Sequence, residues 1–352
     1  MATRYRRNPE LMLEWGEDHD SVVVVDPRTL RRFNVKRTLL DVLNRMSAPV
    51  LPGELAVEGE AEALLMRLAE VGIVEPVDGA RAPDGKPEWT PPELAVHALA
   101  AQGGVSHLRP DEVDIPPARL RHPDAVETIP LPAEEACPSK PLRDVLRSRR
   151  SMRDFAATPV DFVQLARFLG ESARVRGWLG PRSWQATRRP SASGGGRHSL
   201  EIYVFARDVS GLASGAYHYD PFDHALERLR PWGEDLADLQ HRLICLPTLT
   251  EHPPPVSLYL VAHYRRVRWK YGGMTLSLIY RDTGCLLQTM YLVATDLGLA
   301  PCATAAVEAQ AGPDFLRPYR DQVVHVANFA LGNPARTEPT SPAFHPLTGG
   351  DQ

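Results

Sequence analysis

The stretch that bears most directly on the fold reads Arg149-Arg150-Ser151-Met152-Arg153. It brings three guanidinium groups and a hydroxyl within five residues, directly after a helical pattern whose apolar residues are Leu142, Val145 and Leu146. Arginine donates paired hydrogen bonds to phosphate oxygens, and serine adds a neutral donor. The stretch therefore favours a phosphate site, and the alternative is a solvated basic turn.

A loop of small residues further along the chain reads Pro190-Ser191-Ala192-Ser193-Gly194-Gly195-Gly196. It comes immediately before an expected strand at 200–206. Side chains this small let backbone N–H groups approach a flat ring or an anion closely. The spacing is not GxGxxG and the strand follows the loop, so a Rossmann dinucleotide turn is not supported. The alternative is an ordinary surface loop.

Three shorter stretches carry further candidates, namely Lys270-Tyr271-Gly272, Ala303-Thr304-Ala305 and Arg336. An adjacent lysine and tyrosine can act as acid and base, and we expect a loop between two rigid elements to present them. Residues 303–305 follow the end of a long helix, where small side chains let backbone pass close to a cofactor. The alternatives are a surface pair, an ordinary helix exit and a solvated tail.

Apolar patterns predict one large domain over residues 138–340. Strands are expected at 200–206, 216–220, 224–229, 256–263 and 322–331. Thr158 and Pro159 are expected to begin a helix, with Phe162 facing inward. A long helix from about 278 to 297 is apolar on more than one stripe, which indicates burial on several sides, in a core or across a dimer interface.

The segments before this domain differ in character. Residues 1–77 have the outline helix, helix, short strand, which predicts a small winged-helix-like module. This module lacks a basic recognition helix, so we favour peptide docking or a structural role over DNA binding. Residues 78–137 are rich in proline and contain one short helix at 92–101, which predicts a linker that wraps over the large domain.

Composition excludes several classes of protein. The 352 residues are 43% hydrophobic and 24% charged with a net charge of −4, so no basic stripe for nucleic acid is indicated. No apolar run reaches the roughly 18 residues of a membrane span. The first residues lack an apolar signal-peptide core, and we expect a cytoplasmic protein. The four cysteines form no CxxC pair, which indicates neither a zinc site nor a disulfide framework.

Taken in order, these stretches resemble the nitroreductase superfamily, and within it the SagB-type dehydrogenases that oxidise thiazolines and oxazolines in ribosomally made peptides. The resemblance covers about residues 141–336. It implies an α+β fold in which helices flank a central mixed or antiparallel sheet. It also implies bound FMN, a homodimer with the flavin at the interface, and no metal.

The resemblance further implies roles for single residues. The FMN phosphate would be held by Arg149, Arg150, Ser151, Arg153 and Arg336. The isoalloxazine ring would lie against Pro190, Ser191, Ala192, Ser193 and Gly194, and face the backbone of Ala303, Thr304 and Ala305. The Lys-Tyr-Gly motif marks the azoline-oxidising branch, which makes Lys270 and Tyr271 the implied catalytic pair. Which of these two is the base stays open.

Two rival functions remain at this stage. The first is an NAD(P)H-dependent nitro- or quinone reductase on the same fold, against which the Lys-Tyr-Gly motif argues. The second is a non-catalytic scaffold for a peptide cyclase complex, against which the arginine cluster at 149–153 argues. The expected partners are a peptide that carries azolines, a second copy of the chain and, as a candidate, a cyclodehydratase.

Overall fold

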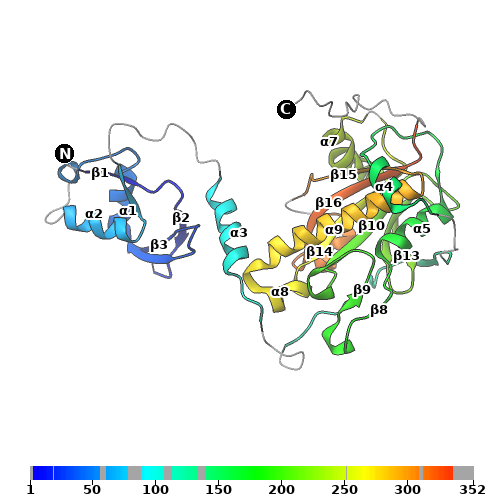
Figure 1. The fold of residues 1–352 in the computed structure, drawn as a ribbon, viewed down its shortest axis with the longest axis horizontal. Helices are drawn as coiled ribbons and strands as arrows, with labels where there is room; N and C mark the ends of the chain where they lie inside the picture. The colour runs from blue at the N-terminus through cyan, green and yellow to red at the C-terminus, as the bar shows by residue number, and fades with distance from the viewer. Residues whose placement is uncertain are drawn as a thin grey trace. The chain divides into compact units, whose positions relative to one another are not determined.

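The computed structural model describes residues 3–18, 20–55, 61–77, 89–106, 113–133, 139–250, 252–308 and 312–335. The chain forms two compact units, Met1–Gly104 and Val105–Gln352 (Figure 1). Within the described ranges, no helix combines the length and apolar character needed to cross a membrane.

The first unit combines a small sheet with three helices. Its elements are β1 (Arg4–Arg7), β2 (Met12–Trp15), β3 (Ser21–Val25), β4 (Arg32–Lys36), α1 (Arg37–Arg45), α2 (Ala61–Glu70), β5 (Val74–Val77) and α3 (Pro91–Gln102). Strands β2, β3 and β4 form an antiparallel sheet, and β1 pairs with β5. The expected order of two helices and a strand is present as α1, α2 and β5. Four strands precede them, and of these only β3, with four consecutive valines, has the continuous apolar run that is typical of a strand.

The second unit is built on one antiparallel sheet in the order β15-β16-β14-β10-β12-β13-β6. Its strands are β6 (Glu127–Pro130), β10 (Leu200–Ala206), β12 (Gly215–Asp220), β13 (Ala225–Pro231), β14 (Val256–His263), β15 (Ala300–Thr304) and β16 (Val323–Gly332). Short strand pairs join β7 (Val160–Asp161) to β11 (Val209–Ser210) and β8 (Gly177–Trp178) to β9 (Thr187–Arg188). The helices are α4 (Leu142–Ser148), α5 (Phe162–Ala173), α6 (Glu234–Gln240), α7 (Leu246–Thr248), α8 (Arg265–Tyr271) and α9 (Thr275–Asp296). This sheet with flanking helices confirms the predicted α+β fold.

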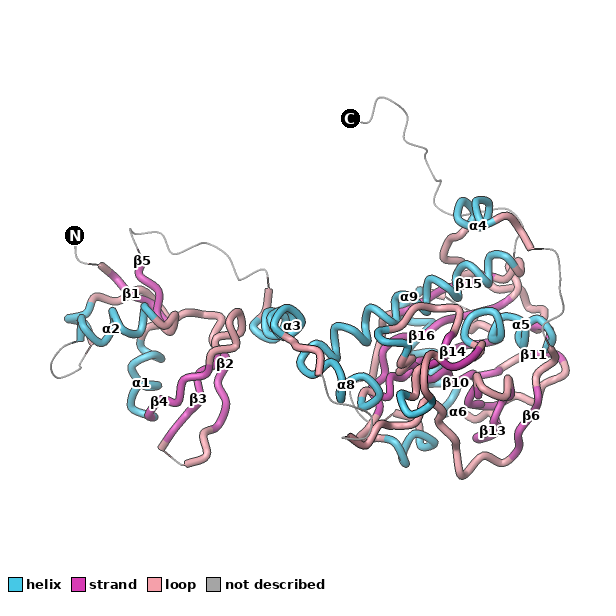
Figure 2. The backbone as a smooth tube through the Cα atoms, turned by 60° about the horizontal axis from the view of Figure 1, so that its bottom comes forward, coloured by secondary structure: helices cyan, strands magenta, loops and turns pink. Residues whose placement is uncertain are grey.

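Helix α9 crosses one face of this sheet (Figures 1 and 2). Its side chains Ile279, Leu286 and Met290 are buried in one cluster with Val204 of β10 and Leu258 of β14. Side chains alternate between the two faces of a strand, so Tyr203 of β10 belongs to a separate cluster on the other face. Helix α5 adds Leu165, Phe168 and Leu169 to the same cluster, and burying each such large apolar side chain contributes roughly 1.5–3 kcal/mol.

Four local expectations differ from the structure. Helix α5 begins at Phe162 with Asp161 as its N-cap, because the Asp161 carboxylate accepts hydrogen bonds from two backbone N–H groups; Thr158 and Pro159 lie before it. Lys270 and Tyr271 end helix α8 instead of lying in a loop. Residues 300–304 form edge strand β15, where the sequence predicts only a helix exit. Within the expected linker 78–137, residues 127–130 pair with β13 as strand β6.

A buried ionic network lies on the sheet face opposite α9. The His218 imidazole is fully buried and contacts Glu201 at 3.0 Å and Glu227 at 2.8 Å. Arg266 of α8 pairs with Glu201 at 2.5 Å. Burial alone would lower the pKa of His218, but the two carboxylates outweigh burial and raise its pKa to about 9.

This network predicts a loss of stability at alkaline pH. His218 loses its proton near pH 6.5 in the unfolded chain and near pH 9 in the folded one. Its contribution to the free energy of unfolding is therefore complete below pH 6.5 and is lost as the pH rises to about 9. His218→Asn should destabilise the protein by about 3–5 kcal/mol at pH 6 and abolish this decline. Urea unfolding between pH 6 and 9.5 measures both effects, with the exposed His252→Asn as control. Parallel pH curves for the wild type and His218→Asn would contradict the assignment.

Candidate functional site

The arginine cluster at 149–153 runs between two strand ends. The backbone N–H of Met152 donates to the carbonyl of Pro301 at the start of β15, at 2.8 Å. The N–H of Ala156 donates to the carbonyl of Asn333, just after β16, also at 2.8 Å. Edge strand β15 and its neighbour β16 thus hold the segment that contains the cluster, and the cluster directly follows the end of helix α4.

Tyr291 of α9 joins the cluster to β15. Its hydroxyl lies 2.8 Å from the Ser151 hydroxyl and accepts a hydrogen bond of 2.8 Å from the backbone N–H of Ala303. The Arg149 guanidinium lies 5.3 Å from the centre of the Tyr291 ring. The structure therefore brings Arg149, Ser151 and Ala303 together around one buried tyrosine that the sequence analysis did not single out.

The guanidinium groups of the cluster have no carboxylate partners. In the part of the chain that the structure describes, no ion pair involves Arg149, Arg150 or Arg153. Arg150 lines a pocket together with Ser148, Met152, Gly298, Pro301 and Pro334. Arg153 is exposed and lies close to Cys302, where its charge opposes the effect of burial, which raises the pKa of the thiol. Three guanidinium groups without a carboxylate partner among the described residues can together bind an anion.

The other candidate residues near the arginine cluster are Thr304, Ala305 and Arg336. Thr304 is buried, and its hydroxyl donates to the carbonyl of Leu243 at 2.7 Å, so the side chain is already bonded. Ala305 follows the end of β15 and is exposed. Arg336 lies outside the described residues.

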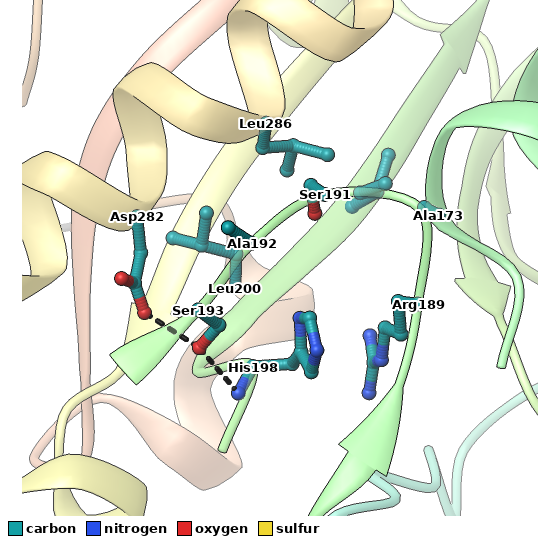
Figure 3. Close-up of a pocket in the computed structure, with 10 residues that line it drawn as sticks. Ala173, Arg189, Ser191, Ala192, Ser193, His198, Leu200, Asp282 and Leu286 are labelled. Atoms are coloured by element: carbon teal, nitrogen blue, oxygen red, sulfur yellow. Dashed lines mark hydrogen bonds between the residues drawn. The ribbon is translucent and has the colours of Figure 1, made fainter. Parts of the chain in front are cut away.

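The small-residue loop at 190–196 is held by helix α9. The Asp282 carboxylate accepts a hydrogen bond from the Ser193 hydroxyl at 2.6 Å (Figure 3). It also accepts one from the Gly194 backbone N–H at 3.1 Å. The Ser193 hydroxyl in turn accepts from the backbone N–H of His198 at 2.9 Å. Pro190 and Ala192 are exposed, whereas Ser191 is buried.

The glycines of this loop meet the rest of the chain at very short range. A Cβ at Gly194 would lie 2.5 Å from the Leu278 side chain of α9. A Cβ at Gly195, whose φ is +61°, would lie 2.6 Å from the Tyr271 hydroxyl. The sequence predicts close approach of this backbone to a ring or an anion. The close approach seen here is to the protein's own side chains.

A small cavity lies behind the loop (Figure 3). Its polar lining comes from Arg189, Ser191, Ser193, His198 and Asp282. Burial lowers the pKa of His198 to about 3, so the imidazole is neutral at physiological pH. One terminal nitrogen of Arg189 is buried without a hydrogen-bond partner among the described residues. A cavity with such a donor suits a bound water molecule.

Lys270 and Tyr271 lie beside this loop at the end of α8. The Lys270 ammonium lies 5.5 Å from the centre of the Trp184 ring and 5.6 Å from that of Tyr271. It makes no ion pair with any residue that the structure describes. Burial raises the pKa of the Tyr271 phenol, and Asp282 raises it further against the opposing charge of Arg197. Tyr271 is thus a phenol that keeps its proton, next to a lysine held by aromatic rings.

The two candidate clusters are spaced along α9. Asp282 anchors the small-residue loop, and Tyr291 anchors the arginine cluster nine residues later, which is about 13 Å along the helix axis. Local sequence patterns do not single out either residue, because their partners are remote in sequence. A signal was present, because a carboxylate on the apolar side of a helix requires a hydrogen-bonding partner.

Comparison with known proteins agrees with this architecture. Residues 146–323 match the model of the nitroreductase family. The protein named "Putative nitroreductase MJ1384", from Methanocaldococcus jannaschii, is 32% identical over 167 residues, which are 47% of this chain and 78% of that protein. The trifolitoxin-processing protein TfxB of Rhizobium leguminosarum bv. trifolii is 28% identical over 114 residues, which are 32% of this chain and 31% of that protein.

Among solved structures, the E. coli microcin synthetase McbBCD complex with truncated pro-MccB17 bound contains a similar chain. The likeness has 17% identity and a TM-score of 0.41, and it covers 57% of this chain and 76% of the other. The family match at 146–323 spans half of the chain and includes both clusters described above. The chain belongs to the nitroreductase family, whose members are generally flavin-dependent oxidoreductases.

Proposed function

We propose that this protein is an FMN-dependent dehydrogenase that converts thiazolines or oxazolines in a ribosomally made peptide into thiazoles or oxazoles. The observation that carries this proposal is the position of Lys270 and Tyr271. They form a potential base and acid, with the Tyr271 hydroxyl against Gly195 of the small-residue loop. A plain reductase of the same fold does not need such a pair, because its substrate gives up no carbon-bound proton.

The residues present fit FMN. Its phosphate dianion matches the three unpaired guanidiniums of Arg149, Arg150 and Arg153 together with the Ser151 hydroxyl, and we assign Arg336 to the same phosphate. We assign the flat ring to the small-residue loop, from Pro190 to Gly194, and to residues 303–305 at the end of edge strand β15. The two clusters would hold opposite ends of this elongated molecule.

The reaction removes two hydrogens from the azoline ring, which becomes aromatic. When bound, FMN would supply the redox chemistry as a hydride acceptor, with molecular oxygen as the final acceptor of the two electrons. The protein supplies a base for the carbon-bound proton, and Lys270 is our candidate. Tyr271 has a raised pKa, so it serves as the proton donor or relay next to that base.

Relatives support two candidate functions. TfxB is named as a trifolitoxin-processing protein, which favours a peptide substrate, and we extend this to a cyclodehydratase as a candidate partner. MJ1384 is named as a nitroreductase, which favours NAD(P)H-dependent reduction as the second candidate. Rapid reduction of the bound flavin by NADPH would favour the second candidate.

We also propose a homodimer and a docking role for the first unit. The exposed side of α9 carries Leu276 and Tyr280, which are 39% and 52% exposed. Gly284 follows on the same side, with nothing within 4 Å of a Cβ. A second copy would cover this side and complete the flavin site. Residues 1–77, proposed as a winged-helix-like module, would engage the peptide.

The phosphate assignment predicts loss of flavin from Arg149→Ala/Arg153→Ala. Each charge-assisted hydrogen bond contributes roughly 1.5–3 kcal/mol, so FMN affinity should fall at least about a hundredfold. Equilibrium dialysis with FMN measures the change. The control Arg143→Ala/Arg147→Ala removes the same charge from the exposed side of α4 and should bind FMN normally. Full flavin occupancy in the Arg149/Arg153 variant would refute the assignment.

The catalytic assignment predicts inactive variants that keep their flavin. Lys270→Ala and Tyr271→Phe should lower the rate of azole formation by roughly 10²–10⁴-fold, as expected for a general base or acid. Their flavin absorption spectra should not change. Single-turnover assays with azole product measured by mass provide the rate, and Arg268→Ala, an exposed charge on the same helix, serves as control. A wild-type rate in Lys270→Ala would leave the reductase as the better assignment.

The proposed interface predicts that Gly284→Arg is a folded monomer. The added side chain has room in one chain, since no atom lies near the Gly284 Cβ position, but it would clash with a second copy on that face. Sedimentation velocity should show the monomer, with weaker FMN binding, whereas Gly284→Ala should stay dimeric. A Gly284→Arg dimer with normal FMN content would contradict this interface.

A further inference from the structure

We propose that Asp282 is a positioning residue that holds both the small-residue loop and the Tyr271 hydroxyl in place for the reaction. This inference rests on the proposed function for its catalytic meaning, but its physical basis lies in the chain itself. Asp282 touches neither the proposed phosphate site nor the Lys270 ammonium. It acts through the residues that it holds.

The first step is the anchoring of the loop. Asp282 is 6% exposed on α9 and accepts from the Ser193 hydroxyl and the Gly194 N–H. Ser193 extends this anchoring to His198, because the Ser193 hydroxyl accepts a hydrogen bond from the His198 backbone N–H. His198 has a φ of +41°, a conformation that costs a non-glycine residue energy and that neighbouring contacts must maintain. One carboxylate thus fixes both the middle and the end of the loop.

The second step leads from the loop to Tyr271. Gly195 directly follows the anchored Gly194, and a Cβ on Gly195 would lie 2.6 Å from the Tyr271 hydroxyl. The hydroxyl therefore rests on backbone whose position Asp282 sets. If the loop moves away from α9, Tyr271 loses the surface that orients it.

The third step is electrostatic. The charged groups that face Tyr271 are Asp282 of α9, Arg197 at the end of the loop and the neighbouring Lys270. Asp282 raises the pKa of the phenol, in addition to burial, and Arg197 lowers it. Burial raises the pKa of Asp282 above its ordinary value, and the hydrogen bonds from Ser193 and Gly194 oppose that rise. The same carboxylate thus orients Tyr271 and favours its protonated form.

Two variants separate these effects. Asp282→Asn removes the charge and one accepting oxygen, so it should loosen the loop and also lower the pKa of Tyr271. Ser193→Ala removes the hydroxyl but keeps the charge, so it should loosen the loop and leave the titration of Tyr271 near that of the wild type. Asp296→Asn changes a carboxylate at the far end of α9 and should affect neither property.

Two measurements on the purified protein test the mobility of the loop and the titration of Tyr271, and neither needs an azoline substrate. Hydrogen exchange of the amides at 193–198 should accelerate about ten- to a hundredfold in Asp282→Asn and in Ser193→Ala, as expected for the loss of a hydrogen bond to a charged group. NMR of tyrosines labelled at the Cζ carbon, with Tyr271 assigned by Tyr271→Phe, should show an earlier titration in Asp282→Asn alone. In azole formation, the alkaline limb of the pH–rate profile should then move to lower pH.

The outcomes are distinct. Wild-type exchange and wild-type Tyr271 titration in Asp282→Asn would overturn the inference. If Asp282→Asn does not fold, unchanged loop exchange in Ser193→Ala would overturn it instead. If both properties change as expected but the wild type never oxidises an azoline, the proposed function fails and the positioning role of Asp282 stands.

Discussion

The burial of α9 against the antiparallel sheet is the constraint on which the rest of the second unit depends. Ile279, Leu286 and Met290 give this helix its place in the core. Two polar residues on the same buried side, Asp282 and Tyr291, then require partners. The small-residue loop donates hydrogen bonds to Asp282. The arginine cluster and β15 form hydrogen bonds with the Tyr291 hydroxyl, so each polar residue contacts one half of the candidate site. The helix that packs against the sheet to form the core therefore also positions both halves of the candidate site.

Much of the fold of the second unit follows from local sequence patterns. Strands β10 and β14 agree with their predicted bounds residue for residue, because both are continuous runs of buried, mainly apolar side chains. Helix α9 ends at Asp296, close to the predicted end at about 297, and Gly298 beyond it has a φ of +73°. By contrast, the sequence does not predict α8. Its arginines suggest an exposed segment, although Arg266 and Val267 are buried.

The site could be predicted only in part. The sequence alone indicates the arginine cluster, the small-residue loop and the Lys270-Tyr271 pair, because the residues of each are contiguous. The contacts that organise them cannot be read in this way: Ser193 and Asp282 are 89 positions apart, and Ser151 and Tyr291 are 140 apart. A local sequence pattern does not predict contacts between residues so far apart in the chain. The buried network of His218, Glu201 and Arg266 was missed for the same reason, since it forms only when the sheet does.

The central claim is that this family member oxidises azolines by means of a base and an acid beside a flavin. It is tested most directly by incubating the FMN-loaded protein with an azoline-containing peptide in air and measuring the mass of the peptide. The account predicts the loss of two hydrogen atoms per azoline ring, with oxygen consumed and no nicotinamide required. A peptide of unchanged mass, together with rapid reduction of the flavin by NADPH, would contradict it.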